Sequence, residues 1–174
     1  MPIKKILVTG GCGTIGTRLC EKLLEKGYDV TGADIQACKW NKKVDALTKR
    51  IDLLDKDQVE KLPRDSDLVI HLAANARVYD LVVDPERALD NVTMLFNTLE
   101  FCRKNGVKRF MFASSRETYG NSGQAVHTEQ DAKIDFCESP YSASKICGEA
   151  FVRSYKQCYG VDFIITRFSN VYGM

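Results

Sequence analysis

A tyrosine and a lysine four residues apart form the first pattern in this sequence that could carry out chemistry. The segment "YSASK" places Tyr141 and Lys145 at positions i and i+4, on one face of a helix. Because a nearby ammonium group favours the phenolate, we expect Lys145 to lower the pKa of Tyr141. Such a tyrosine can take a proton from a hydroxyl group while a hydride leaves the carbon. The pattern alone is also common on surface helices.

Ser115 is the candidate third member of this set. It ends an apolar run in "FASSRETYG", and ligands of parallel sheets bind at the carboxyl ends of the strands. We therefore expect Ser115 to hydrogen-bond the reacting oxygen beside Tyr141. The alternative is a serine that serves only a turn.

Four glycines near the N-terminus suggest a second kind of chemistry. In "VTGGCGTIG", Gly10, Gly13 and Gly16 fit G-x-x-G-x-x-G, and Gly11, Gly13 and Gly16 also fit G-x-G-x-x-G. Backbone without Cβ atoms can turn sharply against a pyrophosphate, and the helix that follows offers free N–H groups and partial positive charge. The alternative is a purely structural turn.

Asp34 supports the nucleotide interpretation. It follows Gly16 by 18 residues, close to the roughly 20 expected for an acid that binds the adenosine ribose hydroxyls. Its carboxylate would repel a 2′-phosphate, and no Arg or Lys follows it immediately. The sequence therefore predicts a dinucleotide site that prefers NAD to NADP, whereas Asp34 alone could be a solvated turn residue.

Short apolar runs alternate with helical patterns along the chain and must position these residues. Predicted strands cover 4–10, 28–35, 42–55 (the weakest), 66–74, 107–115 and 161–170, and predicted helices cover 14–27, 56–63, 84–106 and 139–160. Continuous apolar strands are typical of a sheet that is covered on both faces. We predict an α/β fold, a doubly wound parallel sheet of about six strands with helices on both faces. The long irregular segment 116–139 is expected to be functional or mobile.

Composition argues against several other classes of protein. The chain has 174 residues, enough for one domain, and its formal net charge of +2 favours neither nucleic acid nor a membrane surface as a partner. No apolar segment approaches the roughly 18 residues that span a bilayer, and the apolar run of "MPIKKILVTG" is too short for a signal peptide. We therefore expect a cytoplasmic protein.

The seven cysteines do not form a recognisable metal or disulfide framework. Their number is odd, and there is no C-x-x-C pair and no clustered Cys/His set. We expect no metal, and we expect the cysteines to be small, buried and reduced side chains.

Taken together, these motifs resemble those of the extended short-chain dehydrogenases/reductases of the NAD-dependent epimerase/dehydratase family. They follow that family's order over essentially the whole chain, as "VTGGCGTIG", Asp34, "IDLLD", "HLAANA", Asn91, "SSRETYG", "YSASK" and "RFSNVYG". The resemblance implies a Rossmann fold, NAD as the cofactor and a UDP- or dTDP-linked nucleotide sugar as the substrate.

The same resemblance implies roles for individual residues. It places Ser115, Tyr141 and Lys145 on the family's catalytic triad, and the last two also in the cofactor site. The other cofactor residues that it implies are Thr14 and Ile15 at the pyrophosphate, Asp52 and Leu53 at the adenine, Leu72, Ala73 and Ala74 in the cleft wall, Asn91 as a support, Phe168 near the nicotinamide, and Ile35 and Ser114. It also places Asn170 near the nicotinamide and the start of the substrate site. His71, at the end of a buried strand, is interpreted as a core residue.

Two features depart from the family's pattern. Met94 and Leu95 follow Asn91 where Gly-Thr is frequent, which should alter helix packing more than chemistry. Family members also continue past "NVYG" into a substrate-binding region, whereas this sequence ends at Met174. We therefore expect residues 1–174 to be an NAD-binding Rossmann domain without the family's C-terminal substrate domain, and to be inactive by themselves.

The segment "SSRETYG" ranks the reactions of the complete enzyme. In the family's 4,6-dehydratases an Asp-Glu pair follows the catalytic Ser/Thr, but here Arg116 precedes Glu117. Arginine cannot donate a proton at working pH, so dehydration ranks lowest. Epimerisation through a 4-keto intermediate ranks first, and UDP-glucuronate decarboxylation, in which Glu117 would assist, second. A non-catalytic NAD-binding module and a simple alcohol dehydrogenase or reductase remain as alternatives.

The helices around 89–103 and 143–155 are expected to pair two copies of the chain. Similar enzymes dimerise through a four-helix bundle on this face. More apolar residues occur here than one core face needs, namely Leu89, Val92, Leu95, Phe96 and Leu99. We expect a homodimer.

Overall fold

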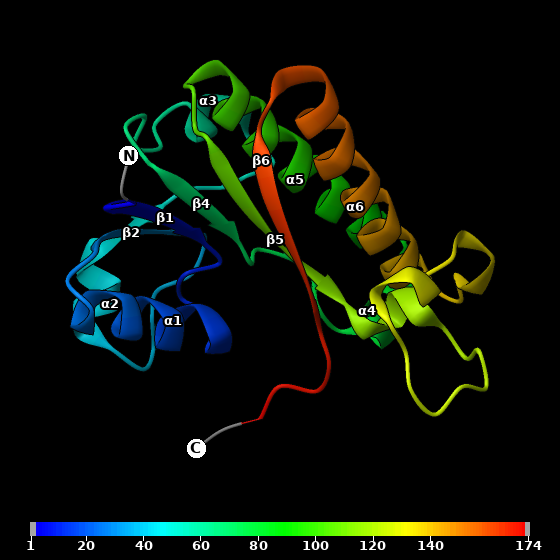
Figure 1. Cartoon of the computed structure of the whole chain (residues 1–174). Coiled ribbons are helices and arrows are strands. Elements are labelled where there is room, and N and C mark those ends of the chain that lie inside the picture. Colours follow the sequence, from blue (N-terminus) through cyan, green and yellow to red (C-terminus); the bar gives the residue numbers. More distant parts are fainter. Residues whose placement is uncertain (1–2, 173–174) are drawn as a thin grey trace.

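Six parallel strands form one sheet in the computed structural model, which describes residues 3–172 (Figure 1). The strands are β1 (Lys5–Thr9), β2 (Asp29–Asp34), β3 (Thr48–Arg50), β4 (Leu68–His71), β5 (Arg109–Ser115) and β6 (Asp162–Phe168). Their spatial order is β3-β2-β1-β4-β5-β6, so the chain begins in the middle and winds outward to each edge in turn. The predicted doubly wound parallel sheet is confirmed.

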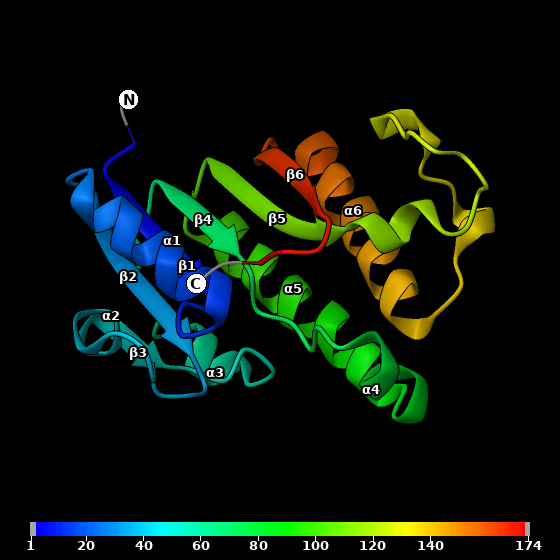
Figure 2. The same cartoon turned by 90° about the horizontal axis from the view of Figure 1, so that it is seen from below.

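Helices cover both faces of this sheet. They are α1 (Thr14–Glu25), α2 (Lys42–Leu47), α3 (Lys56–Val59), α4 (Val78–Val83), α5 (Glu86–Lys104) and α6 (Pro140–Tyr159). Helices α1 and α2 lie on one face, beside β1 and β2, and α3, α5 and α6 lie on the other (Figures 1 and 2). Helix α4 packs against the ends of α5 and α6.

Local signals set the ends of α6, the helix that carries the tyrosine and lysine. Ser139 accepts a hydrogen bond from the backbone of Ser142, whose side chain accepts one in return, and Pro140 occupies the first turn. The helix ends at Gly160, which has the left-handed φ of 72°. Tyr141 and Lys145 therefore lie in the first two turns, directly after a rigid start.

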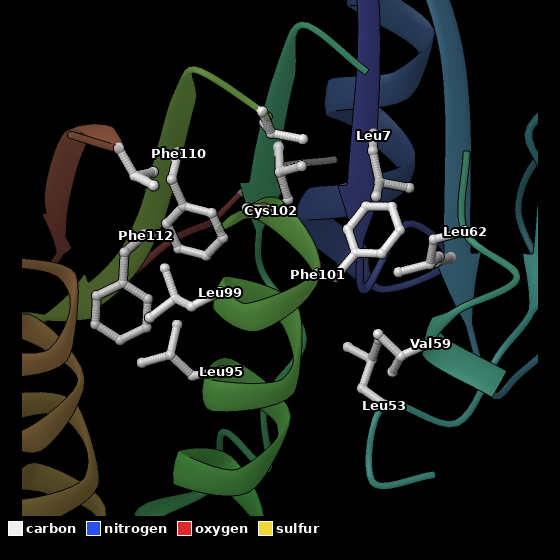
Figure 3. Close-up of a cluster of buried hydrophobic side chains, with 14 of the residues drawn as sticks. Leu7, Leu53, Val59, Leu62, Leu95, Leu99, Phe101, Cys102, Phe110 and Phe112 are labelled. Carbon is white, nitrogen blue, oxygen red and sulfur yellow. The ribbon is translucent and has the colours of Figure 1, made fainter. Parts of the chain in front are cut away.

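The larger of the two cores lies between the sheet and α5 (Figure 3). Leu95 and Leu99 of α5 pack there with Phe110 and Phe112 of β5, and all four side chains are almost fully buried. The second core lies under α1 and contains Ile6, Val8, Cys12, Cys20, Val30, Cys38, Val44 and Ile70. Apolar burial on both faces explains why the strands read as continuous apolar runs.

One local prediction is wrong, and one short helix was not predicted. The segment 42–55 was expected to be a weak strand, but its first half is α2, because the Asn41 side chain accepts hydrogen bonds from the backbone N–H groups of Lys43 and Val44. Only Thr48–Arg50 remain as strand. Helix α4 was not predicted, since its six residues are too few to show a helical period.

The long segment 116–139 contains three short 3₁₀ helices, Arg116–Tyr119, Glu129–Asp131 and Ile134–Phe136. It extends beyond the sheet from the end of β5 to the start of α6 (Figures 1 and 2). The cysteines are free, but Cys137 in this segment and Cys158 near the end of α6 are exposed, so the expectation that all seven are buried is wrong.

Within residues 3–172, none of the helices combines the length and the apolar composition that crossing a membrane requires. The cellular location expected from the sequence stays a prediction.

Candidate functional site

A cleft of about 780 Å³ runs along the carboxyl ends of the strands. The sheet order reverses between β1 and β4, where the crossovers leave to opposite faces, and open α/β sheets bind ligands at this point. Of the residues that the sequence or the resemblance singled out, those that line the cleft are Gly10, Gly13, Thr14, Ile15, Gly16, Asp34, Ile35, Asp52, Leu53, Leu72, Ala73, Ala74, Ser114, Ser115, Glu117, Tyr141, Lys145, Phe168 and Asn170.

The glycine turn between β1 and α1 forms one end of the cleft. Gly10 has φ of 70°, and its N–H donates to Ala33 O at 2.8 Å. A Cβ on Gly16 would lie 2.1 Å from Gly10 O, so only glycine lets the helix approach the turn this closely. No side chain caps the N-terminus of α1 at Gly13. The backbone N–H groups of the first turn thus remain available to an anion.

Asp34 is held rigidly beside this turn. One carboxylate oxygen accepts a hydrogen bond from Cys12 N and the other from Gln36 N, each at 2.9 Å. Each oxygen keeps a further lone pair that a ribose hydroxyl can use. The sequence did not reveal Arg50, which lies opposite Asp34 in the register of β2 and β3. Its guanidinium forms an ion pair with Asp45 and not with Asp34.

The tyrosine, lysine and serine meet at the other end of the cleft. Lys145 is buried and donates from Nζ to Ala113 O at 2.8 Å, at the end of β5. Burial lowers the pKa of Lys145 to about 8. The Ser115 hydroxyl lies near enough to Tyr141 to act on its pKa, and it accepts a hydrogen bond from Glu117 N at 3.2 Å. The fold thus brings together three residues that α6 and β5 contribute.

The expectation that Lys145 lowers the pKa of Tyr141 is wrong for this structure. The pKa of Tyr141 is raised, because the ring is buried and the Glu117 carboxylate lies nearby, and the Ser115 hydroxyl opposes this rise only partly. The Lys145 Nζ atom lies 5.6 Å from the centre of the tyrosine ring and bonds a backbone carbonyl instead.

A buried ion pair lies directly beneath these residues. Arg167 of β6 makes two hydrogen bonds to Glu149 of α6, at 2.8 and 2.7 Å, and both side chains are about one-tenth exposed. Ser114, which lines the cleft, donates to the same carboxylate at 2.7 Å. Arg167 also donates to Tyr119 Oη and Glu129 O, so it ties the 116–139 segment to the sheet.

Sequence reasoning missed this pair, although a signal was present. Tyr141, Lys145 and Glu149 follow one another at intervals of four residues, so they share one face of α6. An acidic residue on the buried face of a helix indicates a buried partner. The partner, Arg167, could not be found in this way, because β6 follows α6 along the chain and meets it only in the folded sheet.

Asn91 is the one predicted cofactor residue that does not line the cleft. It is buried in α5, where its side chain accepts a hydrogen bond from Asn75 N at 2.7 Å and donates one to Asn75 O at 3.1 Å. Asn75 itself lines the cleft. Asn91 therefore supports the wall of the cleft indirectly, by holding the backbone of Asn75.

His71 is a core residue, as interpreted from the sequence. It is 2% exposed, and its Nδ1 atom hydrogen-bonds Thr9 Oγ1 at 2.9 Å. Burial lowers the pKa of His71 to about 3, so the ring is neutral near pH 7. Its ring stacks on Phe110 and Phe112 of the larger core, and it does not line the cleft.

Further cleft residues come mostly from turns and loops, and Val78 of α4 and Asp90 and Met94 of α5 join them. They include Cys12, Gln36, Trp40, Leu54, Asn75, Ala76, Val78, Asp90, Met94, Arg116, Ser169 and Val171. Trp40 is the single tryptophan of the chain and is well exposed. The guanidinium of Arg116 lies 3.7 Å from the Glu117 carboxylate.

Comparisons with known proteins agree over nearly the whole chain. The model of the NAD dependent epimerase/dehydratase family matches residues 6–174. A solved UDP-glucose 4-epimerase of Thermus thermophilus in complex with NAD is 35% identical with a TM-score of 0.88, over 97% of this chain and 56% of that one. A UDP-glucose 4-epimerase of Thermotoga maritima solved with UDP-glucose is 33% identical with a TM-score of 0.87, over 97% and 56%.

A curated UDP-glucuronate 4-epimerase of Thermodesulfobacterium geofontis is 33% identical, over 96% of this chain and 56% of its own length. The chain thus spans about half the length of the curated relatives that it matches.

Proposed function

The chain belongs to the NAD-dependent epimerase/dehydratase family, and from this premise we propose that residues 1–174 form the NAD-binding domain of a nucleotide-sugar epimerase. One observation carries the proposal. A single cleft has the glycine turn and Asp34 at one end and Ser115, Tyr141 and Lys145 at the other. The distance between these groups along the chain makes a chance meeting a poor explanation.

The cleft fits NAD in two ways. Gly10 and Gly16 let the turn pack directly against backbone, and the uncapped start of α1 beside it offers its N–H groups to a pyrophosphate. The anchored Asp34 carboxylate suits the two ribose hydroxyls and disfavours a 2′-phosphate. The remaining lining residues predicted from the sequence complete the proposed site, and Asn91 supports it through Asn75.

The catalytic end supplies a proton relay in this proposal. When bound, NAD provides the hydride acceptor for a sugar carbon. Tyr141 takes the proton of the reacting hydroxyl and later returns it to the 4-keto oxygen, while Ser115 hydrogen-bonds both tyrosine and substrate. Because burial favours the neutral phenol in this structure, proton acceptance requires a cation nearer to the tyrosine oxygen, and Lys145 is the residue that can supply it.

The residues after Ser115 favour epimerisation over the other reactions. A dehydratase needs a proton donor where Arg116 stands, and guanidinium does not titrate near neutral pH. Glu117 keeps UDP-glucuronate decarboxylation as the second candidate, because its carboxylate lies close enough to Tyr141 to raise the pKa of that group. Proton NMR after incubation with UDP-glucose, UDP-glucuronate and dTDP-glucose separates these outcomes.

We expect the 174-residue chain alone to turn over none of these sugars, since the nucleotide contacts of the family lie mostly beyond its matched half. Turnover at about 1 per second or faster would contradict this expectation. NAD binding without turnover in a longer protein that retains this chain would instead favour a non-catalytic module.

Cofactor binding tests the proposal directly, with Trp40 as the reporter. This only tryptophan lines the cleft, so NAD should change its fluorescence. We expect NADP to bind at least about tenfold more weakly than NAD, since charge-assisted hydrogen bonds of about 1.5–3 kcal/mol each are at stake. Asp34→Asn should close most of this gap.

Asp29→Asn is the matched control, because Asp29 begins the same strand at the end remote from the cleft. It should leave both affinities unchanged. Equal or tighter binding of NADP by the unmodified chain would refute the ribose argument.

We further propose that two copies pair through α5 and α6 as a four-helix bundle, with the adjoining α4 at its edge. Of the residues expected at this face, Leu95 and Leu99 belong to the core instead, whereas Leu89 is 67% exposed. Tyr79, Val82 and Val83 of α4 are exposed as well, and such a patch favours a protein partner. Light scattering should give a dimer that Leu89→Asp weakens and the loop control Val126→Asp does not. A monomer at micromolar concentration would contradict the proposal.

A further inference from the structure

Two cysteines lie together at the glycine end of the cleft. Cys12 is part of the glycine turn and lines the cleft, and Cys38 lies in the turn between β2 and α2. Both are buried, and both belong to the core cluster under α1. Neither has a role in the proposed reaction.

The sulfur of Cys38 is surrounded by hydrogen-bond donors. Thr17 Oγ1 lies 3.4 Å from its Sγ atom, and the backbone N–H groups of Trp40 and Asn41 and the Cys12 thiol lie near enough to lower its pKa as well. These donors stabilise a thiolate and lower the pKa of Cys38 although burial alone would raise it.

Neighbouring cysteines show what burial does without such donors. Cys20, in the same cluster, has its pKa raised to about 12 by burial. The pKa of Cys12 is also raised, chiefly by burial, although Arg50 Nη1 donates to its Sγ atom at 3.7 Å. Cys38 and Cys12 thus form an unequal pair, in which one sulfur favours the thiolate and the other the thiol.

Two carboxylates complete the charged surroundings of the pair. Asp34 accepts the N–H of Cys12, and Asp45 accepts the N–H of Cys38 and forms an ion pair with Arg50. Both carboxylates therefore engage donors, which limits the negative charge that they present to the Cys38 sulfur.

We propose that Cys38 and Cys12 are a thiol–disulfide site that reacts with hydroperoxides. The Cys38 thiolate attacks one peroxide oxygen and forms a sulfenic acid. The O–O bond breaks, its electron pair leaves with hydroxide, and the hydroxide takes up a proton from solvent to become water. The Cys12 thiol then attacks the sulfenic sulfur of Cys38, the S–O bond breaks, and a second water leaves. Two thiols are oxidised to one disulfide, and one hydrogen peroxide is reduced to two waters.

The position of Cys12 links this site to the cofactor cleft. Its backbone N–H holds Asp34, and its neighbours are Gly11 and Gly13. A disulfide would tether the turn to Cys38 and restrict its shape. We therefore expect the oxidised chain to bind NAD more weakly, a readout that rests on the proposed function.

Peptide mapping tests the thiol chemistry without any cofactor. The reduced 174-residue chain is treated with one equivalent of hydrogen peroxide and digested under non-reducing conditions. We expect a Cys12–Cys38 disulfide and two thiols fewer than the original seven. Oxidation confined to the exposed Cys137 and Cys158 would overturn the proposal, whatever the result with NAD.

Variants separate the roles of the two sulfurs. Cys12→Ser should leave a sulfenic acid on Cys38 that dimedone traps, and Cys38→Ser should leave Cys12 unoxidised. Cys158→Ser is the control and should not change the disulfide. A sulfenic acid on Cys12 in the Cys38→Ser variant would contradict the assigned order.

A change outside the pair avoids the loss of either sulfur. Thr17→Val removes one donor to Cys38 with little change of shape, so oxidation should slow severalfold. Thr17→Ser keeps the hydroxyl and should restore the rate. Equal rates in the valine and serine variants would show that the donors do not activate Cys38.

Discussion

The two ends of the cleft are built from different groups. At the glycine end, main-chain atoms form most of the site: the turn, the uncapped start of α1 and the N–H groups that hold Asp34. At the catalytic end, charged side chains with little exposed surface form the site, namely Lys145, Glu149 and Arg167, which pack between α6, β5 and β6. One end depends on a shape that glycine allows, and the other on charges that must remain paired.

The strands beneath these two ends differ in how deeply they are buried. Four of the five residues of β1 are buried, whereas every residue of β6 keeps some exposed surface, and the Arg167 side chain itself is 11% exposed. Packing therefore holds β1 by itself, because apolar side chains meet it on both faces. Strand β6 lies at the edge of the sheet and relies more on the pair between Arg167 and Glu149.

The largest effect is expected from breaking that pair. Glu149→Gln leaves the Arg167 guanidinium buried without a countercharge, which should lower the free energy of unfolding by about 3–5 kcal/mol. Urea denaturation followed by circular dichroism measures the change.

Asp162→Asn is the matched control for this prediction. Asp162, at the other end of β6, pairs with Arg109 of β5, but both side chains are nearly half exposed, so the change should be far smaller. Similar losses in the two variants would show that burial does not distinguish the pairs.

A smaller effect is expected at the glycine end. The new methyl group in Gly16→Ala would lie 2.1 Å from Gly10 O, and the shift of α1 that this demands should cost about 1–3 kcal/mol of stability. In Gly13→Ala the new methyl group would lie 3.3 Å from Gly10 O, and φ is −70°, so the free energy of unfolding should change little.

Cofactor titration of the same two variants separates packing from contact. If the glycine end works through its backbone shape, both alanines should weaken NAD binding, although only one destabilises the fold. A Gly16→Ala protein as stable as the parent would contradict the packing argument.

The smallest effect is expected from acid, at the strand between the two ends. The pKa of His71 is about 3 in the folded chain and ordinarily 6.5, so below pH 6.5 the imidazole is mostly protonated in the unfolded chain but stays neutral in the folded chain. Stability is therefore complete above pH 6.5 and falls as the pH drops, by about 1.4 kcal/mol between pH 7.5 and 5.5. Denaturation at these two pH values measures it.

His71→Asn serves as the comparison for the acid effect, since it keeps a polar atom for Thr9 but has no titrating ring. Its stability should be lower overall and nearly flat over this range. A parent chain whose stability does not change between the two pH values would show that His71 does not titrate as its burial implies.

The sequence determined the features that depend on neighbours along the chain. The period of the apolar residues predicted the order of strands and long helices, including a helix over 139–160, and the glycines with Asp34 predicted a nucleotide cleft. Each of these signals lies within a few residues of the feature that it controls. The same reasoning failed over 42–55, where a cap at Asn41 outweighed a weak strand pattern.

Only the tertiary structure decided how distant groups meet. The order β3-β2-β1-β4-β5-β6 places Arg50 beside Asp34, Cys38 beside Cys12, and Arg167 against Glu149, and no spacing in the sequence reports these distances. The pKa of Tyr141 shows the physical reason. The i, i+4 spacing placed Lys145 on the same face, but the direction of the shift depends on burial and on which acceptor the ammonium group reaches, and both arise only when α6 packs against β5.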